Sequence, residues 1–149
     1  MKKILIVGAV AAISALGLTS LASSQPSIKS VKFTAALNVG QEVPHPKGTK
    51  VGAAGRFTAT VTGTTLTWKL TYKNLSGATV GAHVHVGAKG KAGNVAVVLC
   101  PAACASGITG TATVTAEQVA LMKKKGTYVN VHTSKNANGE IRGQIHVAM

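Results

Sequence analysis

Histidines at a spacing suited to metal binding occur in two segments of this chain of 149 residues. His83 and His85 alternate with valine, and His132 ends the similar segment Val-Asn-Val-His. Successive side chains of an extended chain point to opposite faces, so His83 and His85 share one face of a strand. Two imidazoles on one strand and a third from a neighbouring strand can bind copper or zinc and leave one coordination position open. We therefore treat His83, His85 and His132 as a candidate three-histidine metal site.

The segment that follows His132 predicts how this strand is paired. If residues 127–133 and 140–147 form a hairpin, their alternation gives both strands one polar and one apolar face. In this hairpin Glu140 would lie opposite His132. His146 would be roughly 20 Å from Glu140 along the strand, at about 3.3 Å per residue, so His146 and His132 could not belong to the same site. The expected pairs on the polar face are His132 with Glu140, Asn130 with Arg142, and Tyr128 with Gln144.

The same pattern supports a second interpretation, in which the histidines have a structural role. Buried polar side chains are normally hydrogen-bonded, so the histidines would belong to a polar layer that holds glycine-rich loops in place. The other members of this expected polar layer are Asn130, Glu140, Arg142 and Gln144. The sequence leaves both interpretations open, together with a third in which these side chains form a hydrogen-bonding surface for a glycan or another polar ligand.

Alternation of apolar and polar residues predicts an all-β domain with one short helix. Thr115 and Gln118 fit a capping box at the start of the helix, and Gly126 ends it. Short strands with glycine-rich turns and one peripheral helix favour a two-sheet antiparallel Greek-key sandwich. We expect about eight strands, at residues 31–37, 57–62, 66–73, 80–86, 94–99, 107–114, 127–133 and 140–147.

The first 22 residues have the three-part layout of a secretory signal peptide. Two lysines precede an apolar run, and small residues at positions 20 and 22 predict cleavage after Ala22. A retained membrane anchor is the alternative, but the run is short and interrupted. We therefore expect a secreted or periplasmic protein without a transmembrane segment, in which residues 23–30 form a disordered lead-in to a single domain at 31–147.

Cys100 and Cys104 are the only cysteines of the chain. Two cysteines in an exported protein most often form a disulfide bond, which here would close a short loop. A thiolate metal site or a redox dithiol is the alternative, although the spacing differs from that of thioredoxin-like motifs.

The charge of the chain is strongly basic. Lysine and arginine number 16, against three acidic residues, all of them glutamate. Loss of Lys2 and Lys3 with the signal peptide leaves 14 basic residues and a formal charge of +11. This charge favours anionic partners such as cell-envelope polymers. Nucleic acid is not expected, because the basic residues are scattered and the aromatic residues do not interleave with them.

Four short motifs, taken together and in their order along the chain, resemble the CHRD domain, a module first named from chordin and common in exported bacterial proteins. The resemblance spans about residues 31–147 and implies a β-sandwich of immunoglobulin-like or dismutase-like form, an extracellular location and no established catalytic activity. His45 departs from the family, which more often has proline there, so no role is transferred to it. The motifs are Gly-Gln-Glu-Val-Pro at 40–44, Gly-Ala-His-Val-His-Val-Gly at 81–87, Tyr-Val-Asn-Val-His-Thr at 128–133 and Gly-Glu-Ile-Arg-Gly-Gln-Ile at 139–145.

The histidine pattern is also similar to that of copper/zinc superoxide dismutase, with Arg142 before the last strand. Three departures disfavour dismutation: no aspartate is present, residues 87–99 contain no bridging histidine, and the cysteine pair is local. No serine and histidine are placed as nucleophile and base, and the three glutamates are far apart in the sequence. We therefore expect no enzymatic activity and no catalytic residues.

The sequence thus favours an exported, non-catalytic CHRD module that acts in binding or as a structural part of the cell envelope. The main alternative is a copper- or zinc-binding protein that uses the three histidines. A further alternative is a cationic adhesin for anionic surface polymers.

Overall fold

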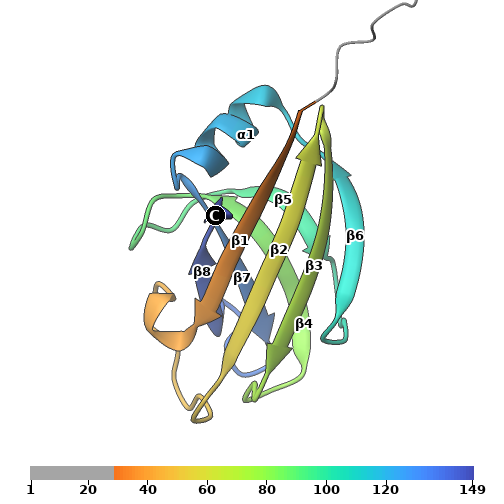
Figure 1. Ribbon diagram of the computed structural model, residues 1–149. Coiled ribbons are helices and arrows are strands. Elements are labelled where there is room, and N and C mark those ends of the chain that lie inside the picture. The colour runs from red at the N-terminus through yellow and green to blue at the C-terminus, as the bar shows by residue number, and fades with distance from the viewer. Residues whose placement is uncertain (1–28) are drawn as a thin grey trace, which may run out of the picture.

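The computed structural model of the protein describes residues 29–149 (Figure 1). The expected signal peptide and most of the expected lead-in lie outside the described residues. The described chain has nine strands, an α-helix and a short 3-10 helix. Their bounds are β1 Ser30–Asn38, η1 Val39–Gln41, β2 Ala54–Thr62, β3 Thr65–Lys73, β4 Thr79–Val86, β5 Val95–Cys100, β6 Ile108–Thr113, α1 Ala116–Lys123, β7 Thr127–Thr133, β8 Ile141–Gln144 and β9 His146–Val147.

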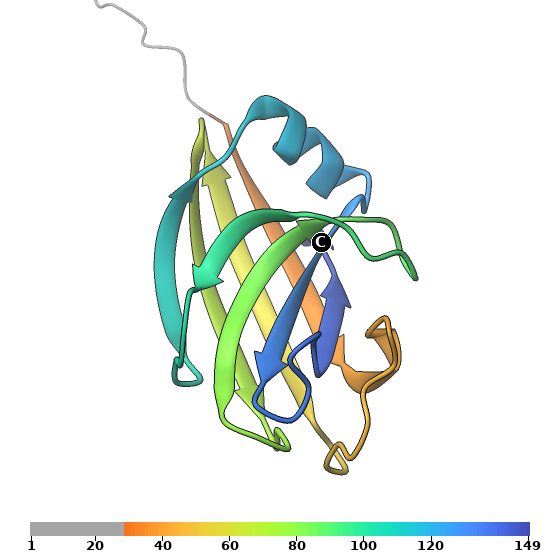
Figure 2. The same cartoon turned by 180° about the vertical axis from the view of Figure 1, so that it is seen from behind.

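The strands form one antiparallel sheet that is nearly closed on itself. Their order is β5-β4-β7-β8-β1-β2-β3-β6, and β9 also pairs with β1. Figures 1 and 2 show the sheet curving around the core, with α1 at one end. The expected all-β class and the single short α-helix are confirmed. The two-sheet Greek-key sandwich is not confirmed, because β1 pairs with β2 on one edge and with β8 and β9 on the other, which makes the sheet continuous.

The last expected strand, at residues 140–147, is divided in two by a change of partner. β8 pairs with β7 and also with β1 at Asn38–Arg142, whereas β9 pairs with β1 alone, through Thr34–His146 and Phe33–Val147. Between them, the Ile145 amide donates a hydrogen bond to the Thr127 carbonyl. His146 therefore lies beside β1, away from the other histidines.

The inner face of the sheet carries the apolar core. Phe33, Phe57, Leu66, Leu70 and Ile141 are each at most 1% exposed. They occupy alternate positions of their strands, as the sequence predicts. Burial of each such side chain contributes roughly 1.5–3 kcal/mol, so the core drives closure of the sheet.

Two local features agree with the sequence. Thr115 and Gln118 form the capping box of α1. Cys100, at the end of β5, forms the expected disulfide bond with Cys104.

Within residues 29–149, no helix is long and apolar enough to span a membrane.

Candidate functional site

The three candidate histidines lie on the outer face of the sheet, where β4 and β7 pair. Val84 and Val129 are cross-strand partners and are buried in the core. Because side chains alternate, the neighbouring pairs His83–Asn130 and His85–Tyr128 face outward. His132 lies diagonally from His83 on the same face, and all three histidines are partly buried.

The expected pairing of β7 with the strand that follows it is present. Tyr128 pairs with Gln144, and Asn130 pairs with Arg142. The register ends at Val131–Ile141: the Glu140 amide donates to the Val131 carbonyl at 2.8 Å, one residue out of step, and the expected pair His132–Glu140 is not among the paired residues. The polar face therefore extends over three adjacent strands, β4, β7 and β8.

The imidazoles converge on a common point. His83, His85 and His132 each offer one ring nitrogen, and these nitrogens all lie within 4.8 Å of one another. Nδ1 of His83 and Nε2 of His132 are 3.0 Å apart. A β-carbon on Gly81 would lie 3.3 Å from Cε1 of His83, so glycine at this position leaves room for the ring.

Backbone carbonyls fix the protonation of two of these rings. Nδ1 of His85 lies 2.8 Å from the Gly93 carbonyl, and Nδ1 of His132 lies 2.9 Å from the Ala137 carbonyl. A carbonyl only accepts hydrogen bonds, so each Nδ1 carries the proton and each Nε2 presents a lone pair. Nε2 of His85 is buried without a hydrogen-bond partner. This arrangement is the one that second-shell carbonyls impose on metal-binding histidines.

The electrostatics of the cluster keep imidazoles uncharged. Burial, together with the proximity of His132 and His85, lowers the pKa of His83 to about 4. Burial also lowers the pKa of His132, against the effect of its hydrogen bond to Ala137. Both rings are therefore neutral near pH 7, and neutral imidazole is the form that binds a metal.

The distances between the three nitrogens are close to those between nitrogen ligands around a bound metal. Zinc–nitrogen distances of about 2.0–2.1 Å place the nitrogens of a trigonal or tetrahedral set roughly 3.3–3.6 Å apart. The upper bound of 4.8 Å in the cluster exceeds this spacing by little more than an ångström. Small rotations of the rings, with transfer of the His83 proton from Nδ1, would bring all three nitrogens to a metal.

Tyr128 packs its ring against that of His85. The two rings are stacked, with centroids 4.9 Å apart and an interplanar angle of 5°. The hydroxyl of Tyr128 accepts a hydrogen bond from the Gly93 amide, and the Gly93 carbonyl contacts His85. Arg142, from the strand on the other side, places Cζ 3.4 Å from the centroid of the Tyr128 ring. Tyr128 is thus the link between His85 and the buried guanidinium.

Arg142 and Gln144 hold the loop that follows β4. Nη2 of Arg142 donates to the Ala88 carbonyl at 2.9 Å. Nε2 of Gln144 lies 2.8 Å from the Gly87 carbonyl and 2.7 Å from that of Lys125. These bonds place the loop at residues 87–94 over the outer face. Both residues thus bind backbone carbonyls at the start of this loop.

Glu42 belongs to this layer, although the sequence assigns it no role. It is 3% exposed, and burial raises its pKa, an effect opposed by the Val43 amide, the Arg142 charge and the Asn130 side chain. A β-carbon on Gly139 would overlap the Glu42 carboxylate, and φ of +126° at this residue also favours glycine. The only signal in the sequence is that Glu42 is one of three carboxylates and lies in a motif of the resemblance.

Glu140 faces a different part of the molecule. Its carboxylate accepts hydrogen bonds from the Ser76 amide at 2.6 Å, the Ser76 hydroxyl at 2.7 Å and the Thr133 hydroxyl at 2.6 Å. Asn136 adds a fourth contact at 3.5 Å. Glu140 therefore joins the β3–β4 connection to the end of β7, and the carboxylate that acts on Arg142 is that of Glu42.

Together, the fold and the site define a small all-β domain with a histidine cluster and a polar layer on the outer face of its sheet. The family model of the CHRD domain matches residues 33–145. The protein therefore belongs to the CHRD domain family, as its motifs predict. Comparison with curated proteins and with solved structures found no match.

Glu140 provides a test of this polar architecture. Burial alone would raise its pKa, but the hydrogen bonds from Ser76, Thr133 and Asn136 hold the pKa below its usual 4.5. The carboxylate therefore stabilises the fold above pH 4.5, and this contribution is lost as the pH falls through the lower pKa of the folded state. We expect Glu140→Gln to lower the free energy of unfolding by about 2 kcal/mol at pH 7 and by less at pH 3, as measured by urea denaturation.

The matched control is Glu117→Gln, since Glu117 is exposed on α1. This substitution is expected to change the free energy of unfolding by less than about 0.5 kcal/mol. An equal loss for Glu140→Gln at pH 7 and pH 3 would contradict the role assigned to the charged carboxylate.

Proposed function

We propose that this CHRD-domain protein is an exported, non-catalytic binding module whose ligand is one copper or zinc ion. The proposed ligands are Nδ1 of His83, Nε2 of His85 and Nε2 of His132. The observation that carries the proposal is that one ring nitrogen from each of the three histidines lies within 4.8 Å of the other two. The carbonyls of Gly93 and Ala137 support it, because they turn lone pairs of His85 and His132 toward the cluster.

The donor set favours copper or zinc over other common ions. Imidazole nitrogen suits copper and zinc, whereas magnesium and calcium prefer oxygen ligands. The cluster found within residues 29–149 consists of three imidazoles without a carboxylate. Three protein ligands also leave room for a water molecule or a ligand from a partner protein.

Two further observations support the exported and non-catalytic parts of the proposal. CHRD domains form a non-enzymatic family, and the match covers most of this chain. The disulfide bond between Cys100 and Cys104 suits an oxidising compartment, as does the amino-terminal sequence.

Calorimetric titration of the purified protein with zinc(II) and with copper(II) tests the proposal. We expect one ion per chain with an affinity tighter than about 10 μM. His83→Ala, His85→Ala and His132→Ala should each weaken binding by at least about 100-fold, because removal of a ligand costs more than the 10–100-fold loss typical of a second-shell change. The electron paramagnetic resonance spectrum of the copper(II) form should show fewer coupled nitrogens in each variant.

His146→Ala is the matched control, because His146 lies beside β1 and outside the cluster. Its affinity for either metal should equal that of the unmodified protein. Millimolar affinity, or affinity unchanged by His83→Ala and His132→Ala, would overturn the proposal.

Tyr128 allows the support of His85 to be tested separately. Tyr128→Phe removes the acceptor of the Gly93 amide but keeps the stacked ring, whereas Tyr128→Leu removes both. We expect Tyr128→Leu to weaken zinc binding by about 10-fold or more and Tyr128→Phe to have a smaller effect. The measurements are zinc affinity by calorimetry and folding by circular dichroism.

Tyr72→Phe serves as the control, since the Tyr72 hydroxyl donates to the Cys104 carbonyl, on another part of the molecule. A folded Tyr128→Leu variant with unchanged zinc affinity would show that the stack does not position His85.

A further inference from the structure

A hydroxyl-rich surface covers the outer face of β1, β2, β3 and β6, which is separate from the histidine cluster. Ten of its outward side chains are threonines. They form cross-strand rows, such as Thr60–Thr67–Thr111 and Thr62–Thr65–Thr113. Strand geometry places neighbouring positions of this face about 4.8 Å apart across the strands and roughly 6.7 Å apart along them. We call this surface the threonine face.

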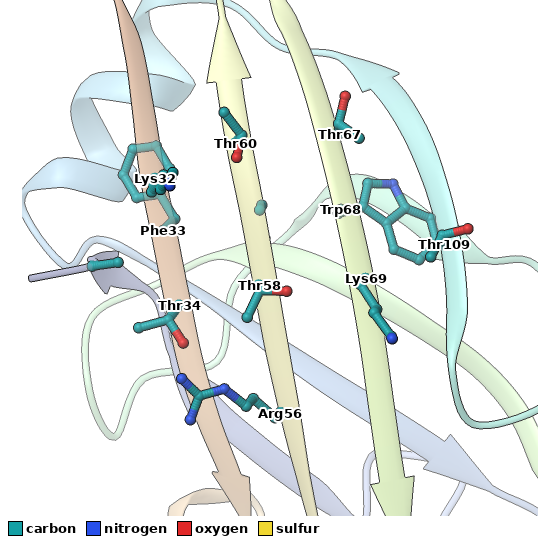
Figure 3. A pocket seen from close by; sticks show the side chains of 12 residues that line it. Lys32, Phe33, Thr34, Arg56, Thr58, Thr60, Thr67, Trp68, Lys69 and Thr109 are labelled. Atoms are coloured by element: carbon teal, nitrogen blue, oxygen red, sulfur yellow. The ribbon is translucent and has the colours of Figure 1, made fainter.

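Four exposed cations lie on this face, and three of them stand among the threonines, whereas Lys73 lies at the end of β3. Lys32 pairs with Thr60, Lys69 pairs with Thr58, and Arg56 pairs with Thr71. All three cations are exposed, and they border a shallow hollow of about 380 Å³ (Figure 3). Figure 3 shows Thr58 and Thr60 at the centre of this hollow, with Lys32, Arg56 and Lys69 around them.

The threonine face carries no opposing charge. Of the three glutamates, Glu42 and Glu140 are buried, and Glu117 lies on α1. Within residues 29–149, thirteen exposed lysines and arginines therefore share the surface with one exposed glutamate. An anionic chain that lies along the face therefore meets cations and hydroxyls but no glutamate of residues 29–149.

The composition of the face distinguishes between classes of anionic polymer. Phe33, Phe57 and Trp68 point inward and are at most 6% exposed, so no aromatic platform is available to stack nucleic acid bases. None of the exposed large apolar residues of the described chain belongs to β1, β2, β3 or β6, so these strands offer no large apolar side chain for insertion into a membrane. Hydroxyls that both donate and accept hydrogen bonds, interspersed with cations, match the hydroxyls and carboxylates of an acidic polysaccharide.

We infer that the threonine face binds an acidic polysaccharide. Lys32, Arg56 and Lys69 form ion pairs with its carboxylates, and the threonine rows form hydrogen bonds with its sugar hydroxyls. This interaction uses a different face from the metal site and does not depend on metal binding.

Binding of polygalacturonate, measured by surface plasmon resonance in the presence of a chelator, tests the inference. The triple variant Lys32→Gln, Arg56→Gln, Lys69→Gln should weaken binding by at least about 10-fold. The matched control replaces Lys50, Lys124 and Lys135 with glutamine, which removes the same charge from exposed positions elsewhere and should weaken binding by less than about 3-fold. Equal losses in the two triple variants would overturn the inference, because they would indicate attraction by net charge alone.

The contribution of the hydroxyls is tested by Thr58→Val, Thr60→Val and Thr67→Val in combination, since valine keeps the branched shape that suits a strand. These substitutions should weaken polygalacturonate binding several-fold without changing its salt dependence. Unchanged binding would overturn the role of the threonines. Tighter binding to single-stranded DNA or to phosphatidylserine vesicles than to polygalacturonate would overturn the choice of a polysaccharide.

Discussion

The register between β4 and β7 is the constraint on which the rest of the structure depends. It pairs Val84 with Val129 on the inner face and His85 with Tyr128 on the outer face. A shift by one residue would turn the valines to the surface and the imidazoles into the core. The apolar core therefore holds the register, and the register places the histidines where loops can cover them. The stability of the fold and the geometry of the candidate metal site thus have the same physical origin.

The outer face of the sheet has two different regions. Over β4, β7 and β8, loops cover the polar side chains, and Arg142 is buried at 1% exposure. A buried charge requires compensation, which Tyr128, Glu42 and the Ala88 carbonyl supply. Over β1, β2, β3 and β6, no comparable loop of residues 29–149 covers the face, and its cations and most of its threonines are exposed (Figures 1 and 3). The covered region suits a small ligand, whereas the open region suits an extended one.

Much of the candidate site was predictable because it depends on alternation along single strands. The pairs Asn130–Arg142 and Tyr128–Gln144 follow from matching the polar and apolar faces of two segments close in the sequence. The positions of Glu42 and Glu140 were not predictable in this way. Glu42 reaches the layer from a segment more than 80 residues before β7, and Glu140 turns to Ser76, in the connection between β3 and β4. No local pattern encodes such long-range contacts.

The sequence by itself determined the strands, the capped helix, the disulfide pair, the family and the shared face of His83 and His85, because each depends on local periodicity or on short motifs. Only the tertiary structure decided that one continuous sheet forms, since β1 pairs along both of its edges. Only the tertiary structure brought one ring nitrogen of each of three histidines within 4.8 Å of the others, since Nδ1 of His85 and of His132 bind the carbonyls of Gly93 and Ala137, in separate loops. The order of residues specifies which groups can meet, and the packing of the sheet and its loops specifies which atoms face one another.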